Sequence, residues 1–81
     1  MITSAASIPF EVDFNGHLYQ GDVRGRFPIT EYETYDVIFQ DGTIKHLEPI
    51  PYAEGYAWFT LSADWQPLLS RIGQTVEQIV A

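Results

Sequence analysis

The chain has 81 residues, of which 46% are hydrophobic and none is cysteine, and its formal net charge is −7. The absence of cysteine excludes disulfide bonds, thiolate metal sites and a cysteine nucleophile, and the acidic charge argues against binding to nucleic acid. We expect a single domain over 1–81 with a small hydrophobic core.

No targeting or membrane segment is evident in the sequence. The first residues, MITSAASI, contain neither a basic region nor a long apolar stretch, so we expect no signal peptide. No apolar run approaches the roughly 18–20 residues of a membrane-spanning helix. Together with the lack of cysteine, these features favour a cytoplasmic protein without a membrane partner.

The first predicted element is a β-hairpin. In the segment IPFEVDF, apolar and polar residues alternate, which is typical of a strand with one buried face, here 8–14. The Asn-Gly pair at 15–16 is typical of a two-residue hairpin turn. The chain then returns as a strand over 17–24, in a register that places Ile8 opposite Val23.

A second hairpin is predicted in the middle of the chain. Strands over 34–40 and 43–48 flank an Asp-Gly pair at 41–42, which we interpret as a two-residue turn. The acid is therefore assigned to the turn and not to a reactive site. Pairing around this turn places Val37 opposite His46.

The rest of the chain is predicted to hold one more strand and a helix. Prolines at 49 and 51 cannot both lie in a central strand, so we expect strand four to end before them. An aromatic strand follows over 56–61. A helix over 64–80 is then predicted from apolar residues at three- and four-residue spacing. The predicted fold class is α+β: a curled antiparallel meander of four to five strands with the helix on one face.

Two strands carry apolar residues on both faces. Ile38 points away from its neighbours Val37 and Phe39, and Trp58 and Phe59 diverge in the same way. One helix covers one face of a sheet only. Either the sheet curls on itself, or the second face meets a partner, for which a homodimer is the leading hypothesis.

The order of features resembles a known group of proteins. FEVDFNGHLYQGDV, then YDVIFQDG, an aromatic strand and LLSRIGQTVEQI resemble small uncharacterised bacterial domains with an NG-type hairpin, a second hairpin and a C-terminal helix. The resemblance implies that fold and carries no activity. YDVIFQDG is also similar to a hairpin of Tudor-like and other small barrels, from which the C-terminal helix departs.

The leading functional hypothesis is a small, acidic, non-enzymatic interaction or self-associating module. Two predicted loops combine aromatic rings with carboxylates, a combination that attracts cationic groups and anchors protein interfaces. The candidate partner-binding residues are Glu31, Tyr32, Tyr35, Tyr52, Tyr56 and Trp58.

The alternative hypothesis is a small-ligand-binding protein or minor enzyme that uses His46 with a nearby carboxylate. No nucleophile motif accompanies this histidine, so we assign no catalytic residue and favour a non-enzymatic role. No spacing of acids and histidines matches a metal site, and we expect no metal and no cofactor.

Overall fold

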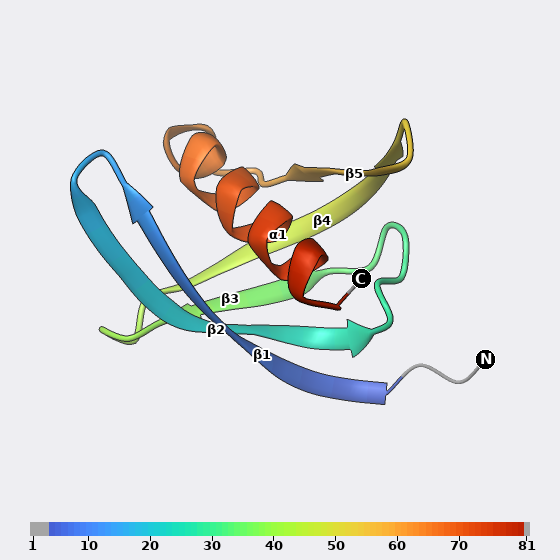
Figure 1. Cartoon of the computed structure of the whole chain (residues 1–81), viewed down its shortest axis with the longest axis horizontal. Coiled ribbons are helices and arrows are strands. Elements are labelled where there is room, and N and C mark those ends of the chain that lie inside the picture. Colours follow the sequence, from blue (N-terminus) through green and yellow to red (C-terminus); the bar gives the residue numbers. More distant parts are fainter. Residues whose placement is uncertain (1–3, 81) are drawn as a thin grey trace.

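The computed structural model describes residues 4–80 as five β-strands followed by a short 3₁₀ turn and one α-helix (Figure 1). The elements are β1 (Ser4–Phe14), β2 (His17–Phe27), β3 (Tyr35–Phe39), β4 (Ile44–Tyr52), β5 (Gly55–Phe59), a 3₁₀ turn (Ala63–Trp65) and α1 (Gln66–Val80). Strands that follow one another in the chain pair antiparallel in the sheet, in the order β1-β2-β3-β4-β5. The predicted α+β meander with one C-terminal helix is confirmed.

The first hairpin has the predicted register. Asn15 and Gly16 form its turn with φ angles of 52° and 80°, a region that Asn and Gly tolerate best. Ile8 lies opposite Val23, as expected, and the strands continue beyond the predicted ends, to Ser4 and Phe27.

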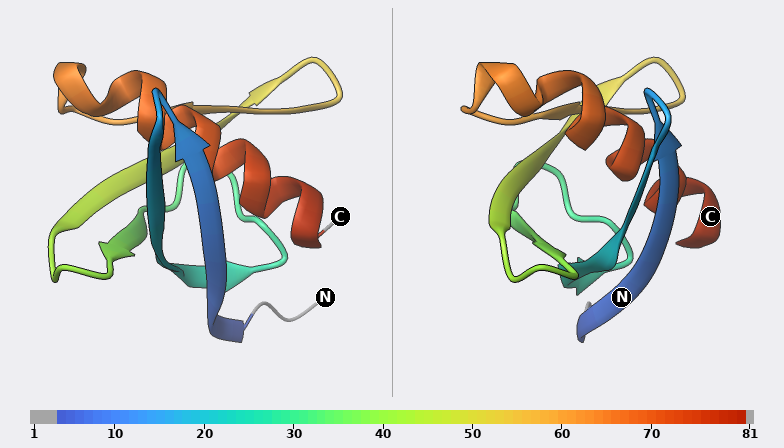
Figure 2. Two further views of the ribbon diagram at one scale, coloured as in Figure 1. Left: turned by 60° about the vertical axis from the view of Figure 1, so that its left-hand side comes forward. Right: turned by 90° about the vertical axis from the view of Figure 1, so that its left-hand side faces the viewer.

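The sheet bends where β2 leaves β3. β2 pairs with β1 along its whole length, but with β3 only over residues 21–24. A Cβ on Gly21 would lie 2.0 Å from the carbonyl oxygen of Ile38, so only glycine permits this approach of the two strands. Figure 2 shows the resulting half-barrel, with α1 packed against β1 and β5 at its margins.

The register predicted for the second hairpin is wrong by one residue. Phe39 N–H donates to the carbonyl of Thr43 at 2.8 Å, which closes a three-residue loop over 40–42. Gly42 takes the left-handed conformation, with φ 92°, as in a type I turn followed by a bulge. Asp36, not Val37, therefore lies opposite His46.

The prediction that β4 ends before its prolines is also wrong, because β4 runs through Pro49 and Pro51 to Tyr52. β3 pairs with β4 only as far as Leu47, so both prolines lie beyond β3. The carbonyl of Pro49 accepts a bond from Tyr32 N–H at 2.9 Å, which shows that Pro49 faces the margin away from β5. By alternation, Pro51 faces the same margin. The absence of an N–H group in the two prolines therefore does not interrupt the hydrogen bonds between β4 and β5.

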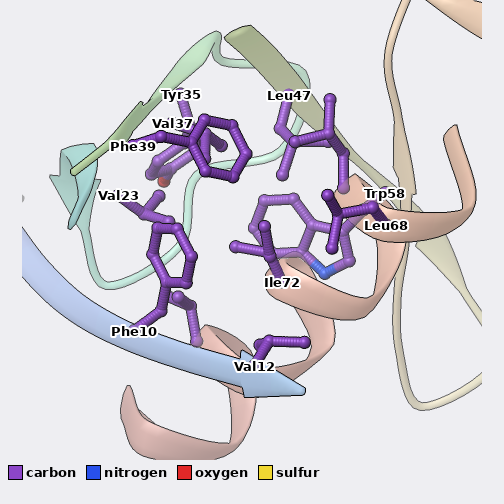
Figure 3. Close-up of a cluster of buried hydrophobic side chains, with 12 residues drawn as sticks. Phe10, Val12, Val23, Tyr35, Val37, Phe39, Leu47, Trp58, Leu68 and Ile72 are labelled. Carbon is purple, nitrogen blue, oxygen red and sulfur yellow. The ribbon is translucent and has the colours of Figure 1, made fainter. Parts of the chain in front are cut away.

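The core lies between α1 and the inner face of the sheet (Figure 3). Alternate residues of each strand point into it, as do the apolar residues of α1. A Cβ on Gly73 would lie 2.3 Å from the Trp58 ring, so the helix needs glycine there to lie close to β5. The buried hydrophobic residues are Phe10, Val12, Val23, Tyr35, Val37, Phe39, Leu47, Trp58, Leu68, Leu69, Ile72 and Val76.

Candidate interaction surfaces

The six predicted partner-binding residues divide between the core and the surface. Tyr35 and Trp58 are 0% and 2% exposed, and Tyr56 packs against the core. The side chains of Tyr35 and Trp58 are therefore not available to a partner in this conformation. Glu31 is exposed, and Tyr32 and Tyr52 are 62% and 72% exposed.

Tyr35 anchors the loop between β2 and β3. Its hydroxyl donates to the carbonyl of Arg26 and accepts from Thr30 N–H at 2.8 Å. Gly25 lies under the ring, where a Cβ would come within 2.3 Å of it. Burial raises the pKa of the Tyr35 hydroxyl, although the bond from Thr30 acts in the opposite direction. The role of this tyrosine is structural.

Trp58 is likewise held on several sides. Its indole N–H donates to Glu77 Oε1 at 3.0 Å, and the Gln66 side chain donates to its backbone carbonyl at 2.6 Å. The same Gln66 amide accepts from Thr60 N–H at 3.0 Å, so it continues the hydrogen bonding of β5 after the strand has ended. These bonds fasten the start of α1 to β5.

The exposed tyrosines lie at one end of the molecule. The β2–β3 loop, which carries Tyr32, and the β4–β5 turn, which follows Tyr52, both lie at the right-hand end in Figure 1. Tyr32 has a φ of 63°, a region that bulky side chains rarely adopt, and its N–H bond to Pro49 holds it there. The structure thus brings the two predicted loops to a common end but leaves two of their rings in the core.

The outer face of the sheet, opposite α1, carries a second set of apolar residues. Ile38 and Ile44 lie directly opposite each other, on β3 and β4. Ile44, Phe59 and Leu61 are 55%, 45% and 92% exposed. Phe59 and Leu61 line a hollow of about 190 Å³ together with His46, which belongs to the same face as Ile44. We call Ile38, Ile44, Phe59 and Leu61 the outer patch.

His46 lies beside this patch and is paired with an acid. Its Nδ1 lies 2.8 Å from Asp36 Oδ1, and the two side chains are 67% and 45% exposed. The corrected register explains the pair, since a shift of one residue moves His46 from the inner to the outer face. The carboxylate required by the alternative hypothesis is therefore present, in the form of Asp36.

A cleft that the sequence did not indicate opens where the β1–β2 hairpin separates from β3. Two adjoining hollows, of about 400 and 280 Å³, share Tyr19 and Trp65 in their linings. Phe39 lies at the base, 5.5 Å from Trp65 and 6.1 Å from Tyr19 between ring centroids. Asp41 lines the first hollow and Asp64 the second. We call these two hollows the Tyr19–Trp65 cleft.

Asp41 belongs to the turn, as the sequence predicts. Its Oδ1 accepts a bond from Thr43 N–H at 2.9 Å, and this bond lowers the pKa of the carboxyl group. The side chain is fully exposed at the rim of the cleft.

Residues 4–80 contain neither a metal-binding cluster nor a membrane-spanning helix. No three histidine or acidic side chains in this range are grouped so that they could hold a metal ion. The helical segment in this range is too short and too polar to cross a lipid bilayer.

The chain was compared with models of protein families, with curated proteins and with solved structures. None of the three comparisons gave a match.

Proposed function

We propose that the protein is a non-enzymatic interaction module that associates with a second copy of itself through the outer face of its sheet. The observation that carries the proposal is the outer patch, in which three large apolar side chains are 45–92% exposed. Large apolar side chains exposed on one face of a sheet are typical of interaction sites.

The charges beside the patch favour a second copy as the partner. Arg24 lies on the outer face of β2, opposite Asp36, and Glu48 lies on the outer face of β4. Within residues 4–80 the one ion pair is that of His46 with Asp36, so Arg24 and Glu48 have no ionic partner there. A two-fold axis along β3 would bring β2 of one copy over β4 of the other. Arg24 would then lie over the opposing His46, with the opposing Glu48 two residues further along β4.

The shape of the face sets the expected strength of the contact. The outer side of the half-barrel is convex, as Figure 2 shows, so two copies touch over a limited area. Interfaces of small area are weak and transient. We therefore expect a concentration-dependent dimer with a dissociation constant on the order of micromolar.

Light scattering across a roughly hundredfold dilution tests the proposal. The wild-type mass should fall from that of a dimer toward that of a monomer, and Ile44→Lys should remain monomeric throughout. Ile79→Lys is the matched control, because Ile79 on α1 is 56% exposed and Ile44 is 55% exposed. A monomeric wild type at the highest concentration, or equal effects of the two lysines, would contradict self-association through this face.

A second candidate function rests on the His46–Asp36 pair. A carboxylate at Nδ1 fixes the ring so that Nε2 is free to accept a proton or bind a ligand, and the hollow beside Phe59 could hold a small molecule. Both side chains are largely exposed, so the surrounding protein has little influence on the reactivity of the ring. A ring titration by NMR with the midpoint of a free histidine, about 6.5, would remove this candidate.

A further inference from the structure

The Tyr19–Trp65 cleft shares no lining residue with the outer patch and has its own chemistry. We infer that this cleft binds an extended peptide segment of a partner protein that carries a lysine or arginine side chain. The inference does not depend on self-association of the outer face.

The first argument is the free margin of β2 beside the cleft. Gln40 N–H donates to the carbonyl of Gln20 at 2.9 Å, which is the last bond between β2 and the β3 side. Leu18 lies two residues earlier, so its backbone N–H and carbonyl point to the same margin. No strand pairs there among the described residues, and Leu18 is 58% exposed. An added peptide strand finds its hydrogen-bonding partners at this position.

The second argument is that Trp65, which lines both hollows, already contacts a cation of the chain itself. Lys45 Nζ lies 4.7 Å from the centroid of the Trp65 ring. Such contacts are favourable because the face of an aromatic ring is electronegative. The contact shows that the Trp65 ring is suited to an ammonium or guanidinium group, and it places one positive charge of the chain beside the cleft.

The third argument is the charge around the rings. Asp41 and Asp64 line the two hollows, and both are exposed. The whole chain carries a formal net charge of −7. An approaching basic segment is therefore attracted at long range and can pair with carboxylates at the rim, whereas an acidic segment is repelled.

The test uses the blocked peptide acetyl-Thr-Val-Lys-Val-Thr-amide and the same peptide with glutamate in place of lysine. Both are titrated into ¹⁵N-labelled protein. The lysine peptide should shift the Trp65 indole and Leu18 amide signals and bind roughly fivefold or more tightly than the glutamate peptide. The indole of Trp58 is the internal reference, since it is buried and bonded to Glu77.

Two variants separate recognition from structural damage. Lys45→Met keeps the apolar stem but removes a positive charge beside Trp65 that repels a cationic peptide, so the lysine peptide should bind roughly two- to fivefold more tightly. Asp41→Asn with Asp64→Asn keeps side-chain hydrogen-bond acceptors but removes two charges, and binding should weaken by a similar factor. Unchanged amide spectra away from the substituted positions verify the fold of each variant.

The results that would overturn the inference are equally definite. The first is a Trp65 indole signal that does not shift at millimolar concentrations of the lysine peptide. The second is equal affinity for the glutamate and lysine peptides, and the third is a lower affinity of Lys45→Met for the lysine peptide. A monomeric protein in light scattering would leave all three readouts unaffected, so the failure of one proposal is distinguishable from the failure of the other.

Discussion

The two faces of the sheet carry similar residues in very different surroundings. On β3, Val37 is buried and Ile38 beside it is only half-buried; at the end of β5, Trp58 is buried and Phe59 is 45% exposed. The inner face is covered because α1 packs on it, and residues 4–80 contain no second α-helix for the outer face. Apolar character alone therefore does not define a core. The apolar residues that the fold leaves uncovered are the ones a partner can contact.

The largest expected effect contrasts the two faces within one strand. Leu47 on β4 is 1% exposed and Ile44 is 55% exposed. Leu47→Ala should lower the free energy of unfolding by about 2–4 kcal/mol, because it leaves a cavity. Ile44→Ala should lower it by no more than about 1 kcal/mol, since water already reaches the side chain. Urea denaturation measures both, and equal losses would show that the outer patch is structural.

The next effect concerns the fit of α1 on the inner face. In Gly73→Ala the new methyl group would overlap the ring of Trp58, where the nearest atom lies 2.3 Å away. We expect a loss of about 1–3 kcal/mol in the free energy of unfolding, in spite of the higher helix propensity of alanine. Thermal denaturation followed by circular dichroism measures the change. A more stable variant would mean that the helix can move away from β5 without loss.

A smaller effect is expected from the hydroxyl group of Tyr35 in the core. Tyr35→Phe removes the bond to the Arg26 carbonyl and leaves Thr30 N–H without this acceptor, a loss of about 1–2 kcal/mol in the free energy of unfolding. The folded-state pKa of Tyr35 is raised above its usual value of 10.0. Its contribution is therefore complete below pH 10 and is lost as the pH rises through the folded-state pKa. Urea denaturation between pH 9 and 11, values that bracket the ordinary tyrosine pKa of about 10, should give a steeper loss for the wild type than for the variant. Parallel curves would contradict this assignment.

The smallest effect lies outside both faces, at the turn that joins β4 and β5. Ala53 has a φ of 51°, a region that glycine adopts without steric penalty. Ala53→Gly should therefore raise the free energy of unfolding, by up to about 1 kcal/mol, although the greater freedom of glycine in the unfolded chain offsets part of the gain. A lower melting temperature for this variant would show that the entropic term dominates.

Most of the fold could be predicted from the sequence, because the alternation in β1 and β2 and the stripe of α1 are local signals. The second hairpin was misplaced because an Asp-Gly pair fits either a two-residue turn or a three-residue loop that ends in glycine. The residues after the loop do not distinguish the two registers. Ile44 and Leu47 are both apolar but lie on opposite faces of the sheet, so either register would place an apolar residue on the inner face. The hydrogen bond from Phe39 to Thr43 decided it.

The candidate sites were harder to predict. Tyr35 lies in phase with Val37 and Phe39, and this period of two could have indicated its burial. Tyr19 and Trp65 pack against the core but remain partly exposed. They reach the surface because the first hairpin leaves the sheet at Gly21, a departure that depends on a contact with Ile38 and has no local signature.

The three prolines within strands have a consequence for behaviour at high concentration. Pro9 lies on β1, where by alternation its ring nitrogen faces the outer margin, and Pro49 and Pro51 face the margin of β4. A margin from which N–H donors are missing is a poorer template for further strands, so growth of the sheet into fibrils is disfavoured at both places. The backbone of Leu18 has no such protection, and occupancy of that position by a partner would guard the fold against aggregation as well.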